Sequence, residues 1–164
     1  MRRNGRTRNA RNEPQAVECG PVDWDEAPAD DYETEATLAR LWIPCSGVVV
    51  TRVSGVGEVE SIRVYTNRMD RLLMARRGIR VFHHWHALTS FEPEARAHLR
   101  AWAASRREML ADAHYLVSSK IVRMAIATAA LALGRDLVGY TDEAKFTLRL
   151  DEAIRDAVRA ELVG

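Results

Sequence analysis

Hydrophobic and polar positions recur along the chain with two different periods, which predict strands and helices in turn. Residues 37–43 and 48–53 have the alternation or the β-branched composition of strands, and a Pro-Cys-Ser-Gly turn joins them. We therefore expect an antiparallel hairpin. Over Glu58–Arg77, apolar residues recur every three or four positions, which is the spacing of one helix face, and Gly78 ends this predicted helix.

The same two periods continue to the end of the chain. We expect strands at Ile79–Trp85, Ala113–Ser118 and Leu137–Tyr140, and helices at Phe91–Met109, Lys120–Leu133 and from Thr141 or Asp142 to Leu162. Pro93 fits the first turn of its helix, where a backbone N–H is not needed. Helices between successive strands require crossover connections. The prediction is an α/β domain whose mixed, mainly parallel sheet carries an N-terminal β-hairpin and four covering helices.

The first 35 residues differ from the rest in charge and in periodicity. Residues 1–12 contain five arginines and no acid, whereas residues 13–35 contain nine acids and no base. Charge blocks without an apolar pattern favour disorder. We therefore expect a disordered charged tail over residues 1–35 and one folded domain over 36–164. The arginines could contact nucleic acid, but a solvated tail is the stronger interpretation, so nucleic acid is not an expected partner.

Composition narrows the class of protein further. Hydrophobic residues make up 47% of the 164 residues, which is enough for a packed core. No apolar run reaches the roughly eighteen residues that a membrane span needs. Cys19 and Cys45 match neither a metal-binding nor a redox spacing. We expect a cytoplasmic protein without a membrane span.

Three histidines, His83, His84 and His86, lie just before a predicted helix. If the strand continues, His84 and His86 share one face and His83 points the other way. Zinc needs a further ligand that no Cys or Glu cluster supplies, so structural or exposed histidines are the better interpretation. The chain has no nucleophile elbow, metalloprotease helix or paired-carboxylate motif. We expect no catalytic residues, no metal and no cofactor. The one catalytic alternative that stays open is a triad of His and Ser residues that the fold brings together.

Hydroxyl side chains lie at two predicted junctions between a strand and a helix. Thr89 and Ser90 precede the second helix, and Ser118-Ser119-Lys120 precedes the third. Because the carboxyl ends of parallel strands meet at one edge of a sheet, we expect both junctions there, with His84 and His86 nearby. Backbone N–H groups at helix starts favour anions. These residues are candidates for binding or switching; alternatively, the hydroxyls only cap their helices.

Three stretches of the chain resemble SpoIIAA-like, STAS-type domains. Val81–Phe91 resembles the family's third strand and the loop that opens its second helix, Ala113–Val122 resembles the fourth strand and the start of the third helix, and Leu137–Asp142 resembles the last strand. The resemblance extends from Leu38 to about Ile154. It implies a STAS-like fold for residues 36–164 and a bacterial-type signalling protein that acts by binding rather than by catalysis.

The resemblance also implies a switch. Anti-sigma-factor antagonists of this class carry a phosphorylatable hydroxyl in an Asp-Ser-Ser-Gly-like loop at the start of the second helix. The matching loop is Leu88–Pro93, where Thr89 and Ser90 occupy the right place but the preceding acid and the following glycine are missing. Other proteins of the broader class bind small lipophilic or anionic molecules.

Two functions are therefore open. The first is a non-enzymatic regulatory or scaffolding domain that binds a protein partner; the alternative is a sensor or carrier of a small lipophilic or anionic ligand. The apolar helix Ile121–Leu133 fits a ligand cavity, a homodimer contact or a core helix buried on two sides. A pocket with converging polar groups favours the ligand-binding function, and a closed core with an exposed apolar patch favours partner binding.

Overall fold

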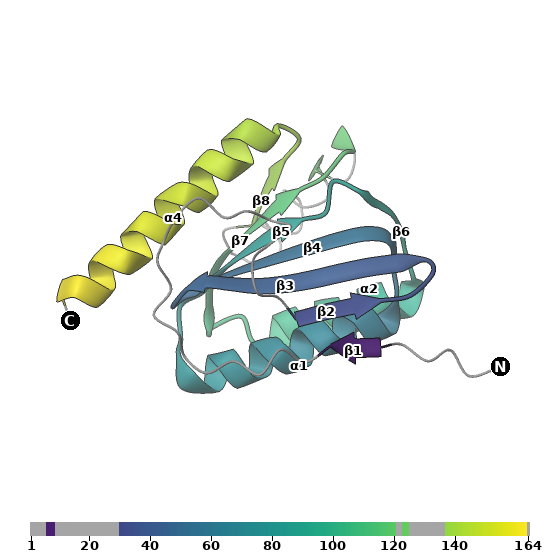
Figure 1. The fold of residues 1–164 in the computed structure, drawn as a ribbon, viewed down its shortest axis with the longest axis horizontal. Helices are drawn as coiled ribbons and strands as arrows, with labels where there is room; N and C mark the ends of the chain where they lie inside the picture. Colours follow the sequence, from purple (N-terminus) through teal and green to yellow (C-terminus); the bar gives the residue numbers. More distant parts are fainter. Residues whose placement is uncertain (1–5, 9–29, 121–122, 125–136, 164) are drawn as a thin grey trace.

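The computed structural model describes residues 6–8, 30–120, 123–124 and 137–163, and in it the predicted hairpin is part of an eight-stranded sheet (Figure 1). β3 (Thr37–Cys45) and β4 (Val48–Gly57) form this hairpin. The other elements are β1 (Arg6–Arg8), β2 (Asp30–Glu33), α1 (Val59–Ala75), β5 (Ile79–His84), β6 (Leu88–Phe91), α2 (Pro93–Ser105), β7 (Leu110–Leu116), β8 (Leu137–Tyr140) and α4 (Glu143–Val163).

The sheet is mixed, as the sequence predicts, but its antiparallel part is wider than one hairpin. The strands follow the order β1, β2, β3, β4, β5, β7 and β8, and β6 pairs with the last residues of β4. The pairs β4–β5, β4–β6, β5–β7 and β7–β8 are parallel. The pairs β1–β2, β2–β3 and β3–β4 are antiparallel. The N-terminal part of the chain therefore contributes two strands, β1 and β2, in addition to the predicted hairpin.

Residues 30–33 correct the prediction of a disordered tail over residues 1–35. They form β2, which pairs along β3, and Tyr32 is only 7% exposed. The hydroxyl of Tyr32 donates to the carboxylate of Glu58 at 3.1 Å, and Arg40 donates to Asp31 at 2.9 Å. Asp31 and Tyr32 of β2 thus have partners in the folded domain, which an average over charge and hydropathy does not reveal. Most of the remaining tail lies outside the described residues, so its disorder stays a prediction.

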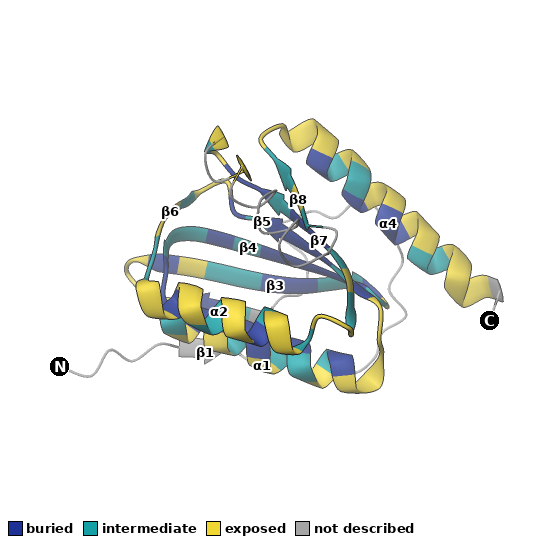
Figure 2. Cartoon of the chain, turned by 180° about the vertical axis from the view of Figure 1, so that it is seen from behind, coloured by how far each residue is buried: buried dark blue, intermediate teal, exposed yellow. Residues whose placement is uncertain are grey.

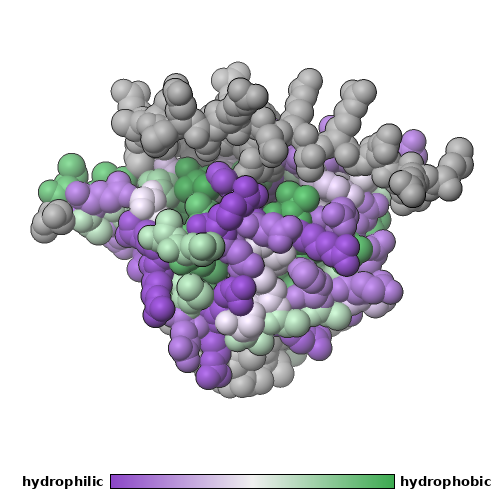
Figure 3. Space-filling model, turned by 90° about the horizontal axis from the view of Figure 1, so that it is seen from below, coloured by the Kyte–Doolittle hydropathy of each residue, from purple (hydrophilic) through white to green (hydrophobic). Residues whose placement is uncertain are grey.

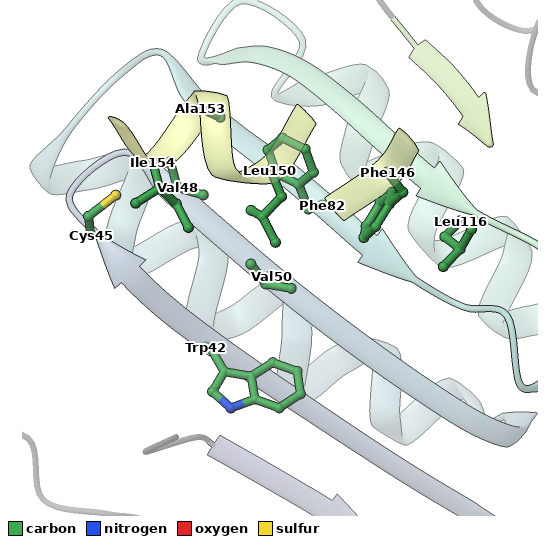
Figure 4. Packing of buried hydrophobic residues seen from close by; sticks show 10 residues of the cluster. All are labelled: Trp42, Cys45, Val48, Val50, Phe82, Leu116, Phe146, Leu150, Ala153 and Ile154. Atoms are coloured by element: carbon green, nitrogen blue, oxygen red, sulfur yellow. The ribbon is translucent and has the colours of Figure 1, made fainter. Parts of the chain in front are cut away.

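Side chains alternate along β5, so successive residues reach opposite faces of the sheet. Phe82 points toward α4, where it joins Phe146 and Leu150 in one hydrophobic cluster (Figure 4). Val81 belongs to a second cluster, which contains Met69 of α1. Figures 1 and 2 show the resulting layers: α4 lies on one side of the sheet, and α1 and α2 lie on the other with their exposed residues facing away from the strands.

Three of the four predicted helices are described, and they lie where the periodicity places them. Pro93 lies in the first turn of α2 as expected, but the helix spans Pro93–Ser105 and is shorter at both ends than the predicted Phe91–Met109. The helix predicted at Lys120–Leu133 lies mostly outside the described residues, and so does its part in a cavity wall or a homodimer contact. Of its start, Lys120, Arg123 and Met124 are described as helical, and the N–H of Arg123 donates to the carbonyl of Ser119 at 3.0 Å. The junction between β7 and this helix is therefore where the sequence predicts it.

The described surface is mainly hydrophilic when the protein is seen from below, and hydrophobic side chains lie there in separate groups (Figure 3). Large exposed hydrophobic residues lie on different elements, such as Met74 on α1 and Leu162 on α4. Among the residues that the structure describes, no helix is both long enough and apolar enough to span a membrane.

Two glycines with similar positive φ angles provide a test of the contact between β4 and the chain before β3. Gly55 has φ +78° and Gly78 has φ +75°. A Cβ at Gly55 would collide with the carbonyl oxygen of Ala36, whereas a Cβ at Gly78 would meet no atom within 4 Å. We expect Gly78→Ala to lower the free energy of unfolding by about 1–2 kcal/mol through backbone strain alone. Gly55→Ala should cost about 2 kcal/mol more, because the backbone must also shift.

Urea denaturation of both variants measures the difference between them. Equal losses of stability would show that the backbone around Ala36 yields freely and that this contact does not fix the start of β3.

Candidate functional site

Three polar side chains stand side by side in the middle of the sheet, on the face that α1 and α2 cover. The parallel register pairs Thr51 of β4 with His83 of β5, and His83 with Tyr115 of β7. The rings of His83 and Tyr115 stack with centroids 4.5 Å apart, and Tyr65 of α1 meets His83 edge-on at 5.7 Å. His83 is 2% exposed. The structure therefore encloses this imidazole in aromatic side chains.

A chain of hydrogen bonds sets the protonation of His83. The indole N–H of Trp85 donates to Thr51 Oγ1 at 3.1 Å, and Oγ1 lies 2.8 Å from Nδ1 of His83. If the Thr51 hydroxyl donates to Nδ1, all three groups have a suitable partner, so this pattern assigns the imidazole proton to Nε2. Burial, with a smaller contribution from the charge of His114, lowers the pKa of His83 to about 3. The ring is therefore neutral near pH 7 and carries one N–H donor at Nε2.

A cavity of about 210 Å³ lies beside this imidazole, between α2 and the sheet. His83, Tyr65 and Tyr115 line it. Val81, Ala113 and Leu137 also line it, and they form the neighbouring cross-strand row on β5, β7 and β8. Because the middle position of that row is an alanine, the row leaves space that a larger side chain would fill.

α2 lines the cavity and also contacts α1, and Trp102 takes part in both. Its lining residues recur at helical spacing, and they include Arg96, Leu99, Arg100 and Ala103. Arg107, which lies beyond the end of α2, also lines the cavity. At the contact with α1, Asp70 of α1 accepts hydrogen bonds at 2.9 Å from both Trp102 Nε1 and Arg106 Nε. His98 of α2 also lies 3.1 Å from Thr66 of α1. These bonds attach α2 to α1 beside the cavity.

A second buried imidazole lies on the α4 face of the sheet. His114 Nδ1 is 3.0 Å from the hydroxyl of Tyr140, and its ring stacks on Phe82 at 4.5 Å. Its Nε2 lies 3.4 Å from Asp112, which also faces Arg80 at 3.5 Å. Burial alone would raise the pKa of Asp112, but the hydrogen bond and charge of His114 and the charge of Arg80 outweigh it, so this pKa is lowered. The group links β5, β7 and β8 below α4.

The structure places Thr89 and Ser90 in a strand, not at the start of a helix. They belong to β6, and Thr89 donates to the carbonyl of Gly55 at 2.8 Å. The N-cap of α2 is Glu92, so the interpretation of Thr89 or Ser90 as a capping hydroxyl is wrong. The carboxylate of Glu92 reaches back to the N–H of Val59 at 2.8 Å, at the start of α1. Because β6 pairs with β4, the hydroxyls of Thr89 and Ser90 lie in a strand that ends before α2 begins.

The predicted histidine pair is not formed. β5 ends at His84, so His84 and His86 do not share a strand face, and this expectation is wrong. His84 Nε2 lies 3.1 Å from Glu143 at the start of α4, whereas His86 is exposed in the turn that follows β5. The expectation that His83 points away from His84 is confirmed, because His83 contacts Tyr65 and His84 contacts Phe146.

The two hydroxyl-bearing junctions, which the sequence predicts at one edge of the sheet, are brought together there only in part. Ser118, Ser119 and Lys120 follow β7, whose last residue, Leu116, is level with the end of β5. Two helix starts at this edge already hold carboxylates: Glu92 bonds to the first N–H of α1, and Asp142 accepts from the N–H of Ala144 at 3.0 Å. An anion there would meet negative charge. The binding or switch roles of Thr89, Ser90, Ser118, Ser119, Lys120, His84 and His86 stay predictions.

Sequence reasoning missed the cavity itself. The arginines of α2 have the spacing of an ordinary solvated helix face, and nothing in that spacing shows whether a cavity or solvent lies next to them. Among the described residues, no group of three or more His, Cys, Asp or Glu side chains could hold a metal ion.

Comparisons with known proteins support the fold. No model of a protein family matches the chain, and no curated protein matches it. A solved structure of an uncharacterized protein of the DUF3478 family from Shewanella loihica PV-4, described as having a SpoIIAA-like fold, is similar to it with a TM-score of 0.61. The match has 10% sequence identity and covers 72% of this chain and 98% of that one. The resemblance to SpoIIAA-like domains is thus confirmed for the fold.

The buried His83 predicts a specific dependence of stability on pH. In the unfolded chain its pKa is near 6.5, and in the folded protein it is about 3. Between these values the unfolded state binds the additional proton, so this group lowers the free energy of unfolding as pH falls, by up to about 1.4 kcal/mol per pH unit. In His83→Phe, which keeps a ring between Tyr65 and Tyr115, we expect this part of the slope to disappear.

Urea denaturation between pH 7 and pH 5 measures the slope. His83→Phe should also be less stable at pH 7 by about 1–3 kcal/mol, because the Thr51 hydroxyl loses its acceptor. The exposed His86 provides a control, since His86→Asn should keep the wild-type slope. A His83→Phe protein with an unchanged slope would show that another group controls the acid sensitivity.

Proposed function

We propose that the chain is a non-enzymatic binding domain of SpoIIAA-like fold that takes up a small lipophilic ligand in the cavity beside α2. The observation that carries this proposal is a cavity of about 210 Å³ next to a buried polar group, His83. An apolar cavity of about 150 Å³ accommodates benzene. The space beside His83 therefore suits one ring with short substituents, which favours a sensor or carrier.

The chemistry of His83 supports binding rather than catalysis. Thr51 and His83 resemble a nucleophile and its base in their contact, but a base with a pKa of about 3 takes up almost no proton near pH 7. The hydroxyl of Thr51 also accepts a hydrogen bond from Trp85, and it is 4% exposed. Thr51 is not among the described residues that line the cavity beside α2. This pair is suited to orienting a ring and not to activating a nucleophile.

One observation favours the second candidate function, a regulatory domain that binds a protein partner. Phe91 of β6 lies 5.7 Å from Trp85 between ring centroids, and Trp85 lies 4.5 Å from His83. Ser90 is exposed beside Phe91. The cavity is thus linked through two aromatic rings to the strand that carries the predicted switch. Intact mass measurement of the protein from its native cells tests the switch: phosphate should be present, and it should be lost in Ser90→Ala.

Filling the cavity tests the ligand-binding proposal. Ala103 is half-buried and lines the cavity, whereas Ala101 is exposed on the same helix and does not line it. We expect Ala103→Leu to reduce the affinity for toluene at least tenfold, with stability unchanged or increased, because the added atoms occupy empty space. Ala101→Leu should bind toluene as the wild type does. Amide shift titrations by NMR measure both affinities.

If neither toluene nor any other single-ring compound, neutral or charged, shifts the amides of the wild-type cavity, the ligand-binding function is wrong. Equal binding by the wild type and Ala103→Leu would place the ligand elsewhere and would contradict it as well.

A further inference from the structure

The cavity has a cationic side, which α2 and the turn after it provide. Arg96 and Arg100 of α2 line the cavity, and so does Arg107, which follows the end of the helix. Among the described lining residues, Asp112 is the only acid, and its carboxylate faces Arg80 and His114. The charge next to the cavity is therefore positive, with no acid free to neutralise it.

The arginines on the two flanks of α2 differ in their partners. Arg106, on the flank toward α1, forms a close ion pair with Asp70 at 2.9 Å. On the cavity side, Arg100 has no ion pair within the described part of the chain, and Arg107 reaches only its neighbour Glu108, at 3.9 Å. An ion pair as long and as exposed as that one contributes little. The guanidinium groups of Arg100 and Arg107 are therefore available to an anion, whereas Arg96 donates to the carbonyl of Phe91 at 3.4 Å.

The cavity also has an aromatic wall, which suits a flat ring. Tyr65, Trp102 and Tyr115 line it together with His83, and the rings of Tyr65 and Trp102 meet edge-to-face at 5.5 Å. Aromatic walls favour an aromatic guest, which can stack or meet them edge-on. The cavity volume limits that guest to one ring with short substituents.

His83 adds a directional contact to this wall. Its Nδ1 is occupied by Thr51, so Nε2 carries the proton, and no hydrogen bond to Nε2 is formed within the described residues. An acceptor atom on a guest can therefore accept a hydrogen bond from Nε2. The guest that satisfies this wall has an oxygen acceptor at its inner end.

We propose that the ligand is a small aromatic carboxylate whose ring lies among Tyr65, Trp102 and Tyr115 and whose carboxylate meets Arg100 and Arg107. This inference rests on the proposed ligand-binding function. A carboxylate fits better than a phosphate ester, because it is planar, pairs with the flat guanidinium fork and adds little volume to a ring that already takes most of the cavity.

Benzoate, benzamide and toluene are the probes, because they share a ring and differ in charge and polarity. Isothermal titration of the full chain should show benzoate binding at least tenfold more tightly than benzamide. Arg100→Gln and Arg107→Gln should each lower the affinity for benzoate several-fold and leave that for benzamide unchanged. Arg71 is exposed on α1 away from the cavity, so Arg71→Gln is the control for net charge and should change neither affinity. Added salt should weaken benzoate binding only.

A second probe addresses the inner end of the ligand. 4-Hydroxybenzoate offers an oxygen acceptor opposite its carboxylate, so it should bind several-fold more tightly than benzoate, and His83→Phe should abolish this gain. Retention of the gain in a folded His83→Phe protein would overturn the role of His83.

The outcomes separate this inference from the proposed function. If toluene and benzamide bind and benzoate binds no better, the carboxylate assignment is overturned while the cavity still binds ligands. If benzoate binds more tightly but neither Arg100→Gln nor Arg107→Gln changes its affinity, the assignment is overturned because the anion is recognised elsewhere. If no probe binds, both proposals fall.

Discussion

A buried imidazole at the centre of a parallel sheet must be neutral and hydrogen-bonded, and the contact between Thr51 and His83 meets both conditions. The contact follows from the register of β4 and β5, which sets these two residues side by side. The next pairing places Tyr115 against the other side of the ring. A slip of one residue would turn His83 toward α4 and bring Phe82 to the face of α1 and α2, so both hydrophobic clusters depend on this register.

The cavity results from two constraints that act on different elements. The sheet contributes Ala113, a small residue in a row that is otherwise filled by larger side chains. The helices contribute the bonds of Asp70 to Trp102 and Arg106, which attach α2 to α1 beside that row. Regular elements thus form the described part of the site, and a site on strands and helices is positioned more precisely than one on loops.

The sequence predicted the elements whose side chains repeat with a clear period, such as α1 and β5, because that period reports burial directly. It missed β2, since the burial of Tyr32 depends on Glu58, which is distant in the chain. It treated Leu88–Phe91 as a loop because the partner of this strand is the end of β4, and pairing over such a distance leaves no local pattern. The cavity was beyond prediction for a similar reason: the exposed arginines of α2 look alike whether solvent or an empty space lies beside them.

The lengths of the strands bear on how the protein behaves at high concentration. Of the strands that the structure describes, the two at the ends of the order are short, with three residues in β1 and four in β8, whereas β3 and β4 inside have nine and ten. Open edges with few unpaired backbone groups offer little template for another chain. The longest and most β-branched segment, β4, would be the most prone to form intermolecular sheets, and it is paired with β3 on one side and with β5 and β6 on the other.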